Sequence, residues 1–188
     1  MIQQEQRDVL AEISSSVAAD YDWSSLTLVA EADVPPDFRR LLVHTEHMTT
    51  TLAAYHGAPV SLTVLDRHVD ESTYARRIQL YVEEPRRVVE FGIMRFDLSL
   101  ASPPVCAAVQ AAQTPLGDIL IEFNVMRVIE PRWFIRIDAG NALLPEMGLP
   151  GDREAFGRIG RIHCDGKPAI DLLEVVTDQC QSSDNKRD

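Results

Sequence analysis

Residues 73–83 read TYARRIQLYVE, and this stretch is the clearest indication of the fold. Its even positions are mostly apolar, and its odd positions are mostly polar; the even positions hold Tyr74, Arg76, Ile78, Leu80 and Val82. Alternation with a period of two is typical of a β-strand that buries one face. The stretch therefore predicts a long strand whose even-numbered side chains point into the core.

The flanking sequence predicts further strands in an antiparallel arrangement. A turn at 84–86 leads to a strand at 87–98 whose two faces are both apolar, which indicates a central position in the sheet. Residues 156–164 and 168–177 are expected to form a hairpin, because Asp165-Gly166 is a favoured two-residue turn. Shorter strands are expected at 60–64, 125–129 and 133–137.

Helical periodicity appears mainly outside these strands. Val9, Leu10, Ile13 and Val17 share one helical face, and short helices are expected after Pro35-Pro36, at 49–55 and at 105–113. Thr114 is expected to cap another helix, with Pro115 at its first position. We therefore predict an α+β fold with helices against one face of an antiparallel sheet, formed by a single domain over 1–178 and followed by a polar tail at 179–188.

The overall composition restricts the class of partner. The 188 residues include 18 Lys and Arg against 29 Asp and Glu, a net charge of −11, which argues against nucleic acid or an anionic membrane as partner. No apolar run is long enough to span a bilayer, no secretory signal is evident, and three cysteines indicate no disulfide framework. We expect a cytoplasmic protein without a metal site, since His44 and His47 lack a third ligand.

Charged residues fall on the buried side of two predicted strands. Arg76 shares its phase with Ile78 and Leu80, and Glu174 points inward by the same argument, as does Arg158 in the preceding strand. One interpretation is a buried ion pair between Arg76 and Glu174. The other is a pocket in which the arginine receives a carboxylate ligand and the glutamate handles a hydroxyl or a proton.

The segment Thr114-Pro115-Leu116-Gly117 is a second candidate for ligand binding. The free backbone amides of Leu116 and Gly117 at a helix start can hold a carboxylate without any net charge. An ordinary helix start without a ligand explains the same residues, so both interpretations stay open.

The ordered motifs of the chain resemble those of the chorismate pyruvate-lyases. The resemblance covers about residues 38 to 177 and rests on His47-Met48-Thr49, Tyr74-Ala75-Arg76-Arg77-Ile78, Thr114-Pro115-Leu116-Gly117 and Gly166-Lys167-Pro168 followed by Glu174. It implies a six-stranded antiparallel sheet with helices on one side and a ligand buried between the two.

The resemblance also implies roles for single residues. Arg76 is then expected to bind a substrate carboxylate, Leu116 to contact the ligand through its amide, Met48 to line the pocket and Glu174 to meet a ring hydroxyl. Some members of that family carry a second arginine just after a glycine, where this chain has Phe91-Gly92-Ile93. Arg95, Arg127 and Arg158 are the candidates for that second carboxylate contact.

The activity implied by the resemblance is elimination of pyruvate from chorismate to give 4-hydroxybenzoate, without metal or organic cofactor, with Arg76 and Glu174 as catalytic residues. One alternative is an enzyme of the same fold that acts on a different cyclic carboxylate. Another is a non-catalytic module that binds a small carboxylate, since a related fold serves as the effector domain of bacterial transcription regulators. The chain shows no DNA-binding helix pair and no basic face, which weakens this last alternative.

Overall fold

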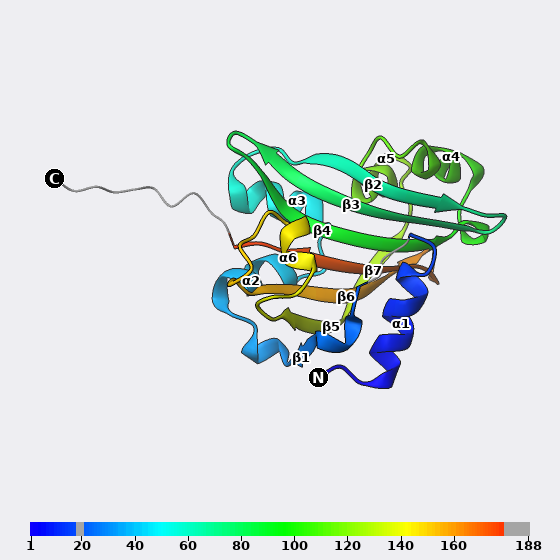
Figure 1. Ribbon diagram of the computed structural model, residues 1–188. Helices are drawn as coiled ribbons and strands as arrows, with labels where there is room; N and C mark the ends of the chain where they lie inside the picture. The colour runs from blue at the N-terminus through cyan, green and yellow to red at the C-terminus, as the bar shows by residue number, and fades with distance from the viewer. Residues whose placement is uncertain (18–20, 179–188) are drawn as a thin grey trace.

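The computed structural model describes residues 1–17 and 21–178, which form one antiparallel sheet and the helices around it (Figure 1). The predicted tail at 179–188, with Cys180, lies outside the described residues. The strands are β1 (Thr27–Val29), β2 (Ser61–Val69), β3 (Thr73–Glu83), β4 (Arg86–Asp97), β5 (Arg127–Ile137), β6 (Ala155–Cys164) and β7 (Lys167–Val176). The helices are α1 (Gln4–Ser14), α2 (Pro36–Leu42), α3 (Met48–His56), α4 (Pro103–Ala111), α5 (Leu116–Glu122) and α6 (Leu143–Glu146), with 3₁₀ turns at Trp23–Ser25, Glu31–Asp33 and Leu98–Leu100.

The sheet confirms the predicted α+β class but has seven strands, in the order β1-β5-β6-β7-β4-β3-β2, where the resemblance implied six. The edge strand β1 comes from a segment with no strand signal, and it pairs with β5 through only three residues. The two strands expected at 125–129 and 133–137 are one strand, β5, with a bulge between Pro131 and Trp133. Both changes lie at the β5 side of the sheet.

The hairpin of β6 and β7 confirms the prediction made from its turn. Asp165 and Gly166 both have positive φ, 51° and 79°, as a tight two-residue turn between twisted strands requires. This turn, together with a bulge between Ile162 and His163, sets the register in which Arg158 of β6 lies opposite Glu174 of β7.

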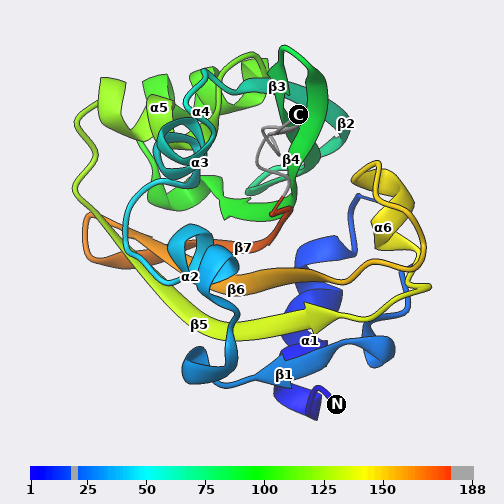
Figure 2. The same cartoon turned by 90° about the vertical axis from the view of Figure 1, so that its left-hand side faces the viewer.

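Helices cover both faces of the sheet (Figure 2). Helices α2 to α5 pack against the face that carries the even-numbered residues of β3 and β4, as expected. Helix α1 packs on the opposite face, where Leu10 and Ile13 join Phe91 and Ile93 in one apolar cluster. The expectation of helices on one side thus holds for α2 to α5 only, because β4 is central and apolar on both faces.

Candidate functional site

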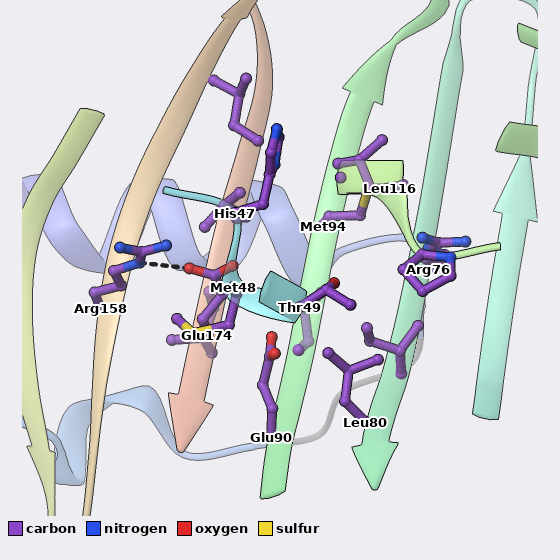
Figure 3. Close-up of a pocket in the computed structure, with 18 of the residues that line it drawn as sticks. His47, Met48, Thr49, Arg76, Leu80, Glu90, Met94, Leu116, Arg158 and Glu174 are labelled. Atoms are coloured by element: carbon purple, nitrogen blue, oxygen red, sulfur yellow. Dashed lines mark hydrogen bonds and ion pairs between the residues drawn. The ribbon is translucent and has the colours of Figure 1, made fainter. Parts of the chain in front are cut away.

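A cavity of about 70 Å³ lies between the even-numbered face of the sheet and the starts of α3 and α5 (Figure 3). This is space for on the order of five waters or a small organic molecule. Four charged residues of the sheet line the cavity, and they are Arg76, Glu90, Arg158 and Glu174. Met48 of α3 and Leu116 of α5 line it from the helical side.

The register of the central strands explains why the cavity exists. Glu174 of β7 lies opposite Gly92 of β4, which in turn lies opposite Ile78 of β3. A Cβ atom at position 92 would lie 3.1 Å from Cγ1 of Ile78 and 3.2 Å from Oε1 of Glu90. Because Gly92 has no side chain, the middle of this row is open and forms the floor of the cavity.

Arg76 is the cation of the cavity that has no counter-ion. Its side chain is buried, with 1% of the residue exposed, and within the described residues no carboxylate lies at ion-pair distance. Nη1 of Arg76 donates to the carbonyl oxygen of Thr114 at 3.5 Å, whereas Nε has no partner in the described structure. Burial lowers the pKa of this guanidinium, and the nearby Tyr74 and Glu90 partly offset that effect. An arginine nevertheless stays charged, so a cation faces the cavity unpaired.

Glu174 pairs with Arg158 rather than with Arg76. Nε of Arg158 donates to Oε2 of Glu174 at 2.5 Å. The interpretation of an Arg76–Glu174 ion pair is therefore wrong, because Arg76 lies two strands away while Arg158 lies directly opposite on the neighbouring strand. Figure 3 shows Arg76 on one side of the cavity and the Arg158–Glu174 pair on the other.

Glu90 is a cavity residue that the sequence analysis missed. The apolar residues on both faces of 87–98 predict a central strand without a buried charge. Glu90 nevertheless shares the even phase of Met94 and Phe96, and this phase is the signal in the sequence that places it at the cavity. Only 3% of Glu90 is exposed. Burial and the nearby Glu174 raise the pKa of its carboxyl well above the ordinary range, against the lowering effect of Arg158 and Arg76.

His47 separates the cavity from a surface pocket that includes Arg127. Its side chain packs against Gly117, and its Nε2 accepts a hydrogen bond from Nε of Arg127. Burial, followed by the charge of Arg127, lowers the pKa of His47, so the imidazole is neutral near pH 7. Arg127 therefore does not line the cavity and is connected to it by its hydrogen bond to His47.

The start of α5 differs by one residue from the prediction. The helix begins at Leu116 with Pro115 in the capping position, and the carbonyl of Thr114 instead accepts from Arg76. Leu116 and Gly117 both line the cavity, as does Met48 at the start of α3. Contact of a ligand with their backbone amides stays a prediction.

Arg95 lies away from the cavity, which corrects its assignment as a ligand-binding residue. It has the same phase as Ile93, and the odd-numbered residues of β4 face α1. Nη1 of Arg95 forms an ion pair with Oε1 of Glu12 at 3.2 Å on that opposite face. Among the other candidates for a second carboxylate contact, Arg158 lines the cavity but already pairs with Glu174.

The described residues contain no cluster of three or more His, Cys, Asp or Glu side chains placed to hold a metal ion. Within the same residues, no helix is long and apolar enough to cross a membrane.

The chain matches no protein-family model and no curated protein. Its structure is similar to that of PhnF from Mycobacterium smegmatis, with 11% identity, a TM-score of 0.51, and coverage of 93% of this chain and 80% of that one. The chain has the chorismate lyase-like fold. At this level of identity the likeness shows the fold alone.

Two further solved structures share smaller parts of the chain. One is a GntR-family transcriptional regulator from Bacillus cereus, with 10% identity, a TM-score of 0.43, and coverage of 62% of this chain and 90% of that one. The other is a ligand-binding domain assigned to a GntR-family regulator from Bordetella bronchiseptica, with 14% identity, a TM-score of 0.48, and coverage of 63% and 85%.

Proposed function

We propose that the chain binds a small organic carboxylate in the cavity, with Arg76 as the partner of the carboxylate. The observation that carries this proposal is a fully buried arginine without a counter-ion at the wall of a cavity. An unpaired buried charge costs several kcal/mol, and a guanidinium matches a carboxylate through two parallel hydrogen bonds. A bound carboxylate would remove that cost.

The opposite wall suggests what else the ligand carries. Glu174 lies two strands from Arg76, which corresponds to about 10 Å between strand axes. Apolar side chains of Met48, Met94 and Leu172 line the same cavity. This combination favours a cyclic carboxylate whose ring packs on the apolar side chains and whose far end offers a hydroxyl to the Glu174 carboxylate.

Calorimetric titration with benzoate and 4-hydroxybenzoate tests this function. We expect the wild type to bind both acids, and Arg76→Met to bind them at least about tenfold more weakly, because it removes a charge-assisted pair. Arg95→Gln is the matched control, since Arg95 lies on the opposite face, and it should bind as the wild type does. Equal binding by Arg76→Met, or no binding by the wild type, would refute the proposal.

A second candidate function is the lyase reaction itself. It is favoured by the placement of Arg76 and Glu174, to which the resemblance gives catalytic roles, in one cavity. In that reaction the ring C–O bond to the enolpyruvyl group breaks, and the carbon that bears the hydroxyl loses its hydrogen as a proton. The departing enolpyruvate takes up a proton to become pyruvate, and the ring becomes aromatic. Arg76 would stabilise negative charge on the departing group, and Glu174 would orient the hydroxyl.

Binding without turnover ranks first because chorismate carries two carboxylates and the cavity offers one unpaired arginine. Arg158 is engaged by Glu174, and Arg127 lies behind His47. A coupled assay of pyruvate release from chorismate separates the two functions. Release above the uncatalysed rate that is lost in Arg76→Met would establish the lyase, and its absence would leave carboxylate binding as the function.

A further inference from the structure

Glu90 has no part in the function proposed above, although it lines the same cavity. Its Oε2 atom is buried and has no hydrogen-bond partner in the described structure. Figure 3 shows its carboxyl directed between Arg76 on one side and the Arg158–Glu174 pair on the other. A buried polar atom without a partner is costly, so its persistence beside a cavity indicates a group that a ligand satisfies.

The charges around Glu90 favour its neutral form. Strand β7 brings Glu174, β6 brings Arg158 and β3 brings Arg76, while His47 at the start of α3 is neutral. Glu174 and Arg158 neutralise each other in their ion pair. If Glu90 is neutral, the cavity therefore keeps the positive charge of Arg76, and if it is ionised, the net charge is zero.

We propose that Glu90 is protonated and donates a hydrogen bond to an acceptor oxygen of the ligand, so that the cavity selects monocarboxylates with an ether or carbonyl oxygen remote from the carboxylate. This rests on the proposed binding of the carboxylate at Arg76. A protonated carboxyl can donate, whereas an ionised one can only accept and would repel such an oxygen. The raised pKa of Glu90 agrees with the protonated form.

The proposal distinguishes Glu90 from Glu174 by the chemistry that each recognises. Glu174 accepts a hydrogen bond from Arg158, and its carboxylate favours a ligand that donates another. Glu90 donates, so it favours an oxygen that has no hydrogen of its own. The matched probes are tetrahydropyran-4-carboxylate and cyclohexanecarboxylate, which have the same shape and differ by one ring oxygen.

Titration of both probes from pH 7 to 9.5 tests the role of Glu90. In the wild type at pH 7 we expect the ring-oxygen probe to bind about fivefold more tightly, the effect of one net hydrogen bond. As pH rises through the ionisation of Glu90, the affinity for both probes should fall, by up to about tenfold for each pH unit.

Two variants and a control distinguish the hydrogen-bond donor at position 90 from its ability to ionise. Glu90→Gln keeps a donor and cannot ionise, so it should retain the ring-oxygen preference and lose the pH dependence. Glu90→Leu should lose the preference. Glu12→Gln alters an exposed carboxylate on the opposite face and should behave as the wild type. A preference that survives in Glu90→Leu, or a pH dependence that survives in Glu90→Gln, would overturn the proposal.

Infrared difference spectroscopy tests whether Glu90 is protonated in the protein without any ligand. The wild type at pH 7 should show the carbonyl band of a protonated carboxyl, which Glu90→Gln lacks and which disappears at high pH. Absence of that band would refute the proposal even if both probes bind. If the band is present and neither probe binds, the proposed carboxylate binding at Arg76 is what has failed.

Discussion

Arg158 and Glu174 lie directly opposite each other on β6 and β7, and Arg158 also bonds to the segment that leads from α2 to His47 at the cavity. Nη1 of Arg158 donates to the carbonyl oxygens of Leu42 at 3.1 Å and of His44 at 2.9 Å. One arginine thus joins the floor of the cavity to the segment between α2 and α3. The carboxylate of Glu174 supplies the counter-ion of that arginine.

Glu174→Leu should be strongly destabilising, because it leaves the buried Arg158 without a counter-ion. Loss of one partner of a buried pair costs about 3–5 kcal/mol, and this is the decrease expected in the free energy of unfolding, measured with urea. The double variant Glu174→Leu with Arg158→Met removes both charges and should regain most of the loss. A single variant as stable as the wild type would contradict the buried pair.

The sequence predicted which residues face the cavity better than it predicted their partners. Period-two phase places Arg76, Glu174 and Arg158 on the buried face without knowledge of the strand order. The partner of Glu174 depends on which strands are neighbours, and phase carries no such information. The pair that joins β6 to β7 therefore became visible only in the sheet.

The other errors have equally local causes. Arg95 was a candidate because it has the same strand phase as Ile93, the position just after Gly92. The odd-numbered residues of β4 face α1, so Arg95 lies on the face opposite the cavity. Glu90 was missed because most residues around it in the central strand are apolar. The strand β1 has only three residues and forms by pairing with β5, so no sequence pattern of its own marks it.

Gly117→Ala should disturb the boundary between the cavity and the pocket at Arg127. A Cβ atom there would lie 2.8 Å from Nδ1 and 2.9 Å from Cγ of His47, so the imidazole that accepts from Arg127 must shift. Such overpacking costs about 1–3 kcal/mol, which thermal or urea unfolding can measure. Gly151→Ala is the control, since nothing lies within 4 Å of its Cβ position, and its effect should stay below about 1 kcal/mol.

Gly92→Ala should weaken ligand binding clearly while it lowers the free energy of unfolding only slightly. The added methyl enters the floor of the cavity and meets Ile78 at 3.1 Å, a contact that a small side-chain movement can relieve. One extra methyl in a pocket changes affinity by about tenfold or more, so benzoate should bind at least that much more weakly. Unchanged affinity in calorimetry would show that the ligand does not lie over Gly92.

Glu90→Gln should change how stability depends on pH. Because the pKa of Glu90 is raised in the folded state, the folded protein holds a proton that the unfolded chain has released. Its stability is therefore greatest below the unfolded pKa and is lost as pH rises toward the folded pKa, by up to about 1.4 kcal/mol for each pH unit. Urea unfolding from pH 5 to 8 should show a growing advantage of Glu90→Gln over the wild type, and a constant difference would contradict this.

His56 should destabilise the folded protein in mild acid. Its Nδ1 accepts from Nη2 of Arg87 at 3.2 Å, and burial together with that charge lowers the pKa of His56 to about 4. Between pH 6.5 and 4 the unfolded chain binds a proton that the folded state does not, so stability falls as pH falls through this window. Urea unfolding at pH 7 and 5 should show that the stability of His56→Gln relative to the wild type increases as pH falls. For the control His68→Gln, at an exposed histidine of β2, the difference from the wild type should stay constant, and a constant difference for His56→Gln as well would disprove the role of His56.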